Sequence, residues 1–439
     1  MASQSTTVSQ PSLPVIFTTK TPYPIPAQKF MVPASWRRYQ LSQLINKALD
    51  LPQVVPFDFI VRGEILRGNL AEWARERGEE TVELEYIESV MPPRKMAALP
   101  HEDWTSSISC QVPGRFLTSS YDGAVRIFDY SQKLLCTAPI HTACTTSVCA
   151  VPSTTERASD GLLLATSSHD LTARLTRVGF PDSPSEKEEI TQLASLHLHT
   201  APLSSIDVDP SGTKLLTASW DTLLGIFDTT IPSVDEVAPD PLPARQKKRR
   251  RVEMTEVPKK VPLAVLRSHT ARVSQARWRE GGKGAVSVGF DSAVRVWDVE
   301  REICAHTVSA SEKPFLALAL LSAGEVGGGG VLAASADRAV TLYDLRAESV
   351  RAASATFAHM GGVPSSLATG SKETQFVSGG YDGVVRLWDV RSAGKEMASF
   401  KVWEGKGEGK VLSVDWREDV VGIAGEGGVE VWRITEQGS

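Results

Sequence analysis

Short segments in which apolar and polar residues alternate recur along the chain from about residue 95 onward. In Val294–Trp297, for example, every second side chain falls on the same face of an extended strand. β-Branched and aromatic residues at these positions favour strands that pack against a neighbouring layer. The pattern predicts a mainly β structure with many short strands.

These alternations belong to a longer repeat, in which a pair of small residues and an acidic residue precede the alternation, and an aromatic residue, often with aspartate, ends it. The repeat acids are 44 to 51 residues apart, apart from one step of 70; they are Asp122, Asp170, Asp221, Asp291, Asp337, Asp382 and Glu426. Histidines precede the first predicted strand of several copies, at His101, His199, His269 and His359, with His141 a looser match. A period of about 40 to 50 residues with four strands is typical of a β-propeller.

The copies resemble the WD-repeat family over residues 95–439. The resemblance implies a seven-bladed propeller in which the histidine, the turn aspartate and a strand hydroxyl form a buried polar network. The six turn aspartates are therefore expected to be structural. Few residues follow Trp432, so we expect Arg94–Leu99 to supply the last strand of blade seven and close the ring.

The N-terminal region has a different pattern. Residues 1–13 are predicted to be disordered, and residues 14–91 to form a separate domain before a propeller that spans 92–439. Two strands precede a helix over Tyr39–Leu49, whose apolar residues recur every three or four positions. The strand Phe57–Val61, a short helix at Leu70–Ala74 and the strand Thr81–Ile87 follow. This order resembles ubiquitin, and the fold class expected is a seven-bladed WD-repeat β-propeller preceded by a small α+β ubiquitin-like (β-grasp) domain.

The long step between Asp221 and Asp291 points to an insertion, which we place at residues 231–262 and expect to be disordered because it is rich in proline and charge. Residues 245–260 hold eight basic and two acidic residues in a chain of net charge -5. The basic run within it consists of Lys247, Lys248, Arg249, Arg250 and Arg251. Such a run indicates nuclear localisation or a nucleic-acid patch, and a solvated loop is the simpler alternative. Flanking prolines and the lack of interleaved aromatic residues favour the import signal.

Composition narrows the classes of function. The longest apolar run, Phe315–Leu321, is too short to cross a membrane, and the first residues lack a secretory signal, so we expect an intracellular protein. The five cysteines are odd in number and form no Cys-x-x-Cys pair, which argues against a disulfide framework and a zinc site. No nucleophile with a paired base stands out. We therefore expect a scaffold that is not an enzyme and binds no cofactor.

Three stretches carry a closer resemblance: Val55–Phe59 with Gly63–Arg67, then Glu79–Tyr86, then His101–Trp104. With the domain order and the basic insertion, the chain resembles the family of nucleolar ribosome-assembly factors that join a second WD-repeat protein and a BRCT-domain protein in the PeBoW complex. The resemblance implies a role in maturation of the large-subunit pre-ribosome and its RNA. It also implies a place in the nucleus, nucleolus and nucleoplasm. Direct RNA contact stays open.

The same resemblance implies that the ubiquitin-like domain docks on midasin, an AAA ATPase that releases the complex from the particle. Midasin holds its clients through an adhesion site, in which a client carboxylate completes the coordination of a magnesium ion. Matching by position gives Glu79 that role, with Glu80 as the neighbouring alternative. The magnesium belongs to the partner. A substrate receptor of a ubiquitin ligase is the alternative function, because such a receptor would also combine a propeller with ubiquitin-like recognition.

Overall fold

The computed structural model describes residues 12–50, 53–74, 81–152, 161–180, 189–236, 257–309, 312–322, 329–345, 353–370, 374–404 and 409–434. The chain forms two compact units, one built mainly from the first 94 residues and the other mainly from residues 95–433. Strands dominate both units, and the predicted fold class is confirmed.

The N-terminal unit is a five-stranded sheet in the order β2-β1-β5-β3-β4, in which β1 and β5 run parallel and the other neighbouring strands run antiparallel. Its elements are β1 (Ser12–Thr18), β2 (Lys29–Pro33), α1 (Arg38–Leu49), β3 (Phe57–Val61), β4 (Glu64–Ile65), α2 (Leu70–Ala74) and β5 (Val82–Glu88). The observed order matches the ubiquitin-like prediction, with one additional short strand, β4.

Alternation builds the core of this unit. Val15 and Phe17 of β1 face the same side as Leu84 and Tyr86 of β5, where Leu41 and Ile45 of α1 join them in one buried cluster. The spacing of four between Leu41 and Ile45 puts both on one face of the helix. The prediction that residues 1–13 are disordered is wrong for Ser12 and Leu13, because both pair with β2 and extend the sheet.

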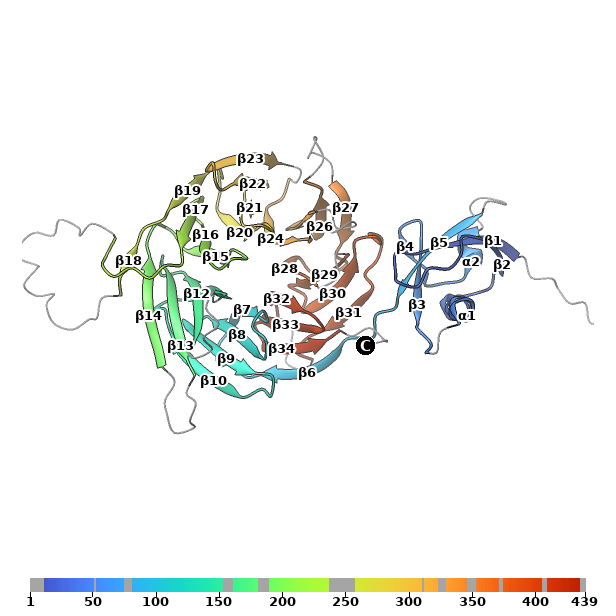
Figure 1. Cartoon of the computed structure of the whole chain (residues 1–439), viewed down its shortest axis with the longest axis horizontal. Coiled ribbons are helices and arrows are strands. Elements are labelled where there is room, and N and C mark those ends of the chain that lie inside the picture. Colours follow the sequence, from blue (N-terminus) through green and yellow to red (C-terminus); the bar gives the residue numbers. More distant parts are fainter. Residues whose placement is uncertain are drawn as a thin grey trace, which may run out of the picture. The chain divides into compact units, whose positions relative to one another are not determined.

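The second unit contains seven sheets, which surround a central opening in Figure 1. The first four sheets consist of β7 (Thr105–Ser109), β8 (Arg115–Ser120), β9 (Ala124–Asp129) and β10 (Leu134–Pro139); β11 (Thr145–Ala150), β12 (Leu162–Ser168), β13 (Ala173–Gly179), β14 (Glu189–Leu196) and β18 (Lys259–Lys260); β15 (Leu203–Val208), β16 (Lys214–Ser219), β17 (Leu223–Asp228) and β19 (Ala264–Arg267); and β20 (Val273–Trp278), β21 (Gly284–Gly289), β22 (Val294–Asp298) and β23 (Ile303–Val308).

The remaining three sheets consist of β24 (Phe315–Leu320), β25 (Val331–Ser335), β26 (Ala339–Tyr343) and β27 (Ala353–Ala358); β28 (Pro364–Thr369), β29 (Gln375–Gly380), β30 (Val384–Asp389) and β31 (Ala398–Lys401); and β32 (Val411–Arg417), β33 (Val420–Gly425), β34 (Gly428–Arg433) and β6 (Arg94–Leu99). We number these sheets as blades one to seven in chain order. The residues predicted as the closing strand, Arg94–Leu99, lie beside β34 in blade seven.

The first strands of neighbouring blades contact one another in sequence, and β32 of blade seven contacts β7 of blade one. The ring is therefore closed. Apolar side chains fill the space between blades; between blades three and four, for example, Leu216 and Ala218 pack with Ala276, Trp278 and Trp297. Because each blade buries its faces only against its neighbours, stability depends on the whole ring.

The segment predicted as a disordered insertion, residues 231–262, departs from that prediction at its C-terminal end. Lys259 and Lys260 form β18, which pairs in parallel with Ser195 and Leu196 of β14. A strand at the edge of a sheet has unpaired backbone donors and acceptors, and β18 bonds to some of those on β14. The Lys260 side chain is buried because its ammonium group pairs with Asp228. Residues 237–256 lie outside the described residues.

Candidate functional site: polar networks, channel and turn face of the propeller

Blade four contains the most extensive polar network of the repeat. His269 Nδ1 donates to Asp291 at 2.9 Å, and Nε2 accepts from the Ser287 hydroxyl at 2.7 Å. Trp297 donates to the same hydroxyl at 2.8 Å, and Arg295 pairs with Asp291. All of these side chains are buried or nearly so. A buried network whose members are all satisfied rigidifies the structure around it.

The network recurs in other blades with variation. His141 binds Asp170 and Thr166, each at 2.8 Å, so the looser sequence match proves to be a complete member. His199 binds Asp221 at 3.0 Å and Thr217 at 2.9 Å.

Blades one and six keep the histidine and the hydroxyl but rearrange the acid. His101 binds Thr118 at 2.9 Å and the Leu99 carbonyl at 3.1 Å, while Asp122 pairs with Arg126. In blade six His359 binds Ser378 at 2.8 Å, and Asp382 pairs with Arg386 at 2.7 Å.

The charge states follow from these contacts. Burial lowers the pKa of His269, and hydrogen bonding to Asp291 offsets that effect only in part. Burial alone would raise the pKa of Asp291, but hydrogen bonds from His269 and Arg295 outweigh it and hold the pKa below the usual range. The result is a neutral histidine beside an ionised aspartate, each with its partners inside the blade. This is the geometry of a structural network.

Two further repeat acids, those of blades five and seven, also depart from the histidine–aspartate arrangement. Asp337 of blade five is exposed, and it accepts a hydrogen bond from the backbone of Ala339 at 3.2 Å. Glu426 was predicted to replace the turn aspartate of blade seven, and that alignment is wrong. The Glu426 N–H donates to the Lys410 carbonyl, as the Tyr121 N–H donates to the Trp104 carbonyl, so Gly427 stands at the aspartate position. The Glu426 carboxylate accepts from the Lys410 N–H at 3.1 Å.

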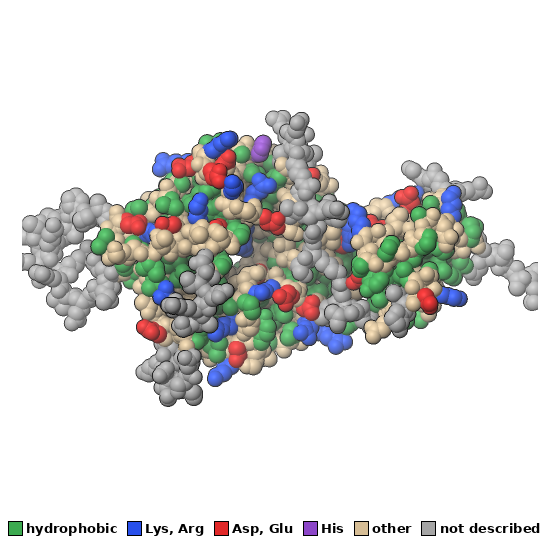
Figure 2. All heavy atoms as spheres, viewed as in Figure 1, with side chains coloured by type: hydrophobic (Ala, Val, Ile, Leu, Met, Phe, Trp, Pro, Cys, Tyr) green, Lys and Arg blue, Asp and Glu red, His purple; other side chains and the backbone are tan. Residues whose placement is uncertain are grey.

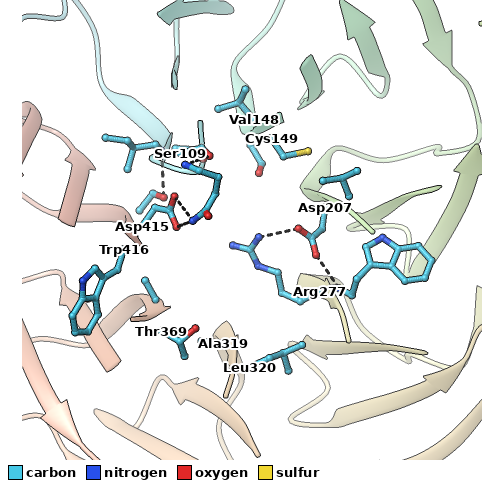
Figure 3. Close-up of a pocket in the computed structure, with 18 of the residues that line it drawn as sticks. Ser109, Val148, Cys149, Asp207, Arg277, Ala319, Leu320, Thr369, Asp415 and Trp416 are labelled. Carbon is cyan, nitrogen blue, oxygen red and sulfur yellow. Dashed lines mark hydrogen bonds and ion pairs between the residues drawn. The ribbon is translucent and has the colours of Figure 1, made fainter. Parts of the chain in front are cut away.

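The central opening holds a cavity of about 400 Å³ lined by the first strands of the blades. Arg277 extends into it and pairs with Asp207 at 3.1 Å, while Asp415 lies on another wall and accepts from the Cys110 N–H and the Gln111 amide (Figure 3). Burial raises the pKa of the Cys149 thiol, which also lines the cavity. A protonated thiol is a poor nucleophile, and the charged groups that Figure 3 draws have partners within the protein.

The residue just before each turn aspartate is a feature that the sequence interpretation did not single out. In every blade its backbone N–H donates to the carbonyl of a residue just before the first strand, at 2.9 to 3.1 Å. These residues therefore share one end of the second strand and one face of the ring, which we call the turn face. They are Tyr121, His169, Trp220, Phe290, Ala336, Tyr381 and Glu426. The repeated aromatic residue was visible in the sequence, next to the acid used to find the repeats.

The residues predicted to contact midasin, Glu79 and Glu80, fall outside the described residues, between α2 and β5. The basic run Lys247–Arg251 falls outside them as well. No helix in the described parts of the chain is long and apolar enough to span a membrane. Among the same residues, no group of three or more histidine, cysteine or acidic side chains is placed to hold a metal ion.

Comparison with known proteins supplies the family. Residues 13–74 match the NLE (NUC135) domain, and residues 190–228, 260–298 and 353–389 match the WD domain, G-beta repeat. The chain is 54% identical to ribosome biogenesis protein YTM1 of Laccaria bicolor, over 99% of this chain and 97% of that protein. It is 50% identical to the YTM1 protein of Coprinopsis cinerea, over 96% and 94%.

The chain belongs to the YTM1 family of ribosome biogenesis proteins. A more divergent member, from Eremothecium gossypii, is still 31% identical over 90% of this chain and 89% of its own length. Because the similarity covers both the NLE domain and the propeller, the role in ribosome biogenesis applies to the whole domain arrangement.

Proposed function

We propose that this protein is a non-catalytic scaffold of the PeBoW type, which acts in assembly of the large-subunit pre-ribosome and in maturation of its RNA. The propeller binds the WD-repeat partner and thereby joins the BRCT-domain protein, and the ubiquitin-like domain docks on midasin for release. The observation that carries the proposal is family membership over nearly the full chain.

The hydrogen bonding inside the propeller supports a scaffold function. The histidine and aspartate side chains of the blade-four network are buried and hydrogen-bonded within the blade, so neither is free to act as an acid or a base. A ring with a turn face built from backbone-anchored residues provides area for binding a partner.

The basic run Lys247–Arg251 is proposed to serve nuclear import, followed by accumulation in the nucleolus and nucleoplasm. Its place in the sequence supports this role. N-terminal to the run, the carboxylates of Asp235 and Glu236 accept hydrogen bonds from the backbone N–H groups of Lys259 and Val261 C-terminal to it, so these two flanking segments are joined at the edge of the propeller.

In the proposed docking on midasin, Glu79 of this chain supplies one carboxylate oxygen to the magnesium ion of the partner's adhesion site. Magnesium prefers hard oxygen ligands. A glutamate provides a negatively charged oxygen, whereas an amide provides an uncharged one. In the sequence, Glu79 lies three residues before Val82, the first residue of β5. The chain itself needs no cofactor.

The decisive experiment measures binding of the full-length chain to the midasin adhesion domain in magnesium and in EDTA. We expect Glu79→Ala and Glu79→Gln each to lower the affinity at least tenfold, and Glu79→Asp to retain part of it. Glu83→Ala is the matched control, because Glu83 is an exposed glutamate on the adjoining strand. Binding to the WD-repeat partner should be unchanged in all four variants.

Equal binding of the wild type in EDTA would show that no metal bridge forms. Loss of binding in Glu80→Ala alone would move the bridging role to Glu80.

A further inference from the structure

We propose that β6 is a mechanical latch, so that a pull on the ubiquitin-like domain opens blade seven before any other blade. The pull comes from midasin in the function proposed above, and the inference rests on that function for its source of force. It goes further because it names the element of this chain that yields. Three features carry it: the covalent path of the load, the direction of the strands and a buried ion pair.

The covalent path of the load leads directly into β6. Residues 89–93 connect β5 of the ubiquitin-like domain to β6, so a pull on the domain reaches the propeller at Arg94. In blade one, by contrast, the outermost strand β10 follows β9 after residues 130–133. β6 lies beside β34, which belongs to the other end of the chain (Figure 1). Noncovalent contacts therefore hold β6 in blade seven.

The direction of the two strands makes them easy to separate by such a load. The carbonyl of Leu99, the last residue of β6, lies next to Gly428, the first residue of β34. Lys95, near the start of β6, reaches Glu430 further along β34, so the strands run in opposite directions. The hydrogen bonds of an antiparallel pair are perpendicular to its strands. A load that separates the adjacent strand ends therefore breaks these bonds one after another.

The carboxylate of Glu430 links β6 to two other segments. It pairs with the ammonium group of Lys95 and accepts hydrogen bonds from the Trp432 indole at 3.0 Å and the Trp403 N–H at 3.3 Å. Of these three donors, Lys95 alone carries a charge. If β6 leaves, Glu430 loses its cation, and a buried charge without compensation is strongly destabilising. Loss of β6 therefore weakens β34 as well, and the opening spreads through blade seven.

Burial of the carboxylate distinguishes this pair from ion pairs on the surface. Figure 2 shows basic and acidic side chains interspersed over the visible surface of the propeller, where water and salt screen their attraction. Lys283 and Glu300 of blade four form such a pair at 3.4 Å, with side chains 80% and 61% exposed. The Glu430 side chain is only 3% exposed. The pair in blade four is therefore a matched control for the latch.

Blade seven also lacks the histidine and aspartate that brace blade four. In blade two, the His141 N–H donates to the carbonyl of the residue after the preceding turn aspartate. The Val402 N–H donates in the same way to Gly383, so valine takes the histidine position of blade seven. Gly427 takes the aspartate position. Without these two side chains, blade seven depends more on the contacts that β6 provides.

Two buried cysteines can report on the opening. Ala97 and Leu99 of β6 belong to a buried cluster between blades seven and one that also contains Cys110. Burial raises the pKa of the Cys110 thiol, and the side chain is 1% exposed, so it reacts only when this cluster opens. Cys136 is equally buried in the cluster between blades one and two. The two thiols therefore distinguish opening at blade seven from opening elsewhere.

The first test is pulsed labelling of the full-length chain with iodoacetamide, read by mass spectrometry. We expect Lys95→Ala to raise the labelling rate of Cys110 about tenfold, because a hydrogen bond to a charged group is lost. The rate at Cys136 should stay within about twofold of the wild type, since that cluster lies in the next junction. Lys95→Arg keeps the cation and should label like the wild type. Lys283→Ala, the matched control, should change neither rate.

The second test applies force to single molecules of the full-length chain, held by its two termini in optical tweezers. We expect the first opening of the propeller to release β6 together with β32–β34, a gain in length of about 100 Å. Unfolding of the ubiquitin-like sheet gives a separate and larger gain of about 260 Å. Lys95→Ala should lower the mean force of the propeller opening, and Lys283→Ala should leave it unchanged.

Equal increases in labelling at Cys110 and Cys136 would overturn the latch, because they would show that the whole ring opens at once. An unchanged rate at Cys110 in Lys95→Ala, or a first propeller opening of a different length, would overturn it as well. Neither measurement contains midasin. A failure of the latch is therefore distinguished from a failure of the proposed docking, which the comparison of magnesium and EDTA tests.

Discussion

Blades four and five are neighbouring four-stranded sheets, but their interiors are filled by different kinds of side chain. In blade four, the Ser287 hydroxyl donates to His269 and accepts from Trp297, within a buried network that includes Asp291. In blade five, Ala333 of β25 stands at the position that Ser287 has in β21, and the repeat acid Asp337 is exposed. The blade is filled instead by apolar contacts among residues such as Phe315, Leu318 and Tyr343.

The comparison shows that the polar network is not needed to form a blade. Replacing every buried polar partner together with apolar groups leaves nothing unsatisfied, so the exchange can be nearly neutral. Removing one partner from a network that is present leaves the others buried without a bond. We therefore expect a single substitution of the repeat acid to lower the free energy of unfolding far more in blade four than in blade five, although both blades fold with their natural sequences.

The largest effect on stability should come from a deletion that opens the ring, because every blade depends on its closure. Deleting Arg94–Leu99 removes the outermost strand of blade seven and exposes the edge of β34. Because the blades depend on one closed ring, unfolding should become less cooperative and the melting temperature should fall by well over 10 °C. Calorimetry of chains beginning at Pro92 and at Trp104 tests this, and equal melting temperatures would refute ring closure by this strand.

The next effect contrasts the two blades directly. Asp291→Ala leaves Arg295 and His269 buried without their acid, and breaking such a buried pair costs about 3–5 kcal/mol of unfolding free energy. Asp337→Ala removes an exposed side chain and should change the unfolding free energy by about 0.5 kcal/mol or less. Denaturant unfolding of the two variants measures both values. Similar losses of unfolding free energy in the two variants would mean that the polar network does not make blade four more sensitive than blade five.

Blade six gives the smallest and most gradual effect, as a function of pH. Burial and the nearby Arg386 lower the pKa of His359 to about 4, so the folded protein binds this proton less readily than the unfolded chain. Between the unfolded pKa of about 6.5 and the folded value, stability must fall as pH falls, by about 3 kcal/mol in total.

Unfolding of the wild type and of His359→Gln between pH 7 and pH 4.5 isolates this contribution. The variant should be less stable at pH 7, and its stability should decline less steeply toward acid. Parallel pH profiles would show that His359 does not titrate differently in the two states.

The sequence predicted a large part of the fold because its signals are local and repeated. Alternation identified the strands, and the spacing of the acids set the number of blades. Apolar spacing placed the helix over Tyr39–Leu49, within one residue of α1 at Arg38–Leu49. The strand Phe57–Val61 and the short helix Leu70–Ala74 were predicted with their observed bounds.

The errors arose where pairing between distant segments determines the outcome. The alignment of Glu426 was wrong because the bond from its N–H to the Lys410 carbonyl, 16 residues away, places Gly427 at the turn position. The end of the insertion was predicted to be disordered from its charge, yet Lys260 is buried because Asp228, far from it in sequence, neutralises it there. His101 and Asp122 match the repeat but do not bond to each other as His269 and Asp291 do.

The sequence by itself determined the class of the protein: the strand periodicity, the number of repeats, the helices of the N-terminal domain and the motifs that place the chain in its family. The tertiary structure alone decided which buried groups satisfy one another and which residues share a face. The turn face exists only because equivalent positions of different blades, 45 to 70 residues apart in the sequence, come together when the ring closes. Hydrogen bonds and ring contacts depend on distance in space, and a linear pattern records only distance along the chain.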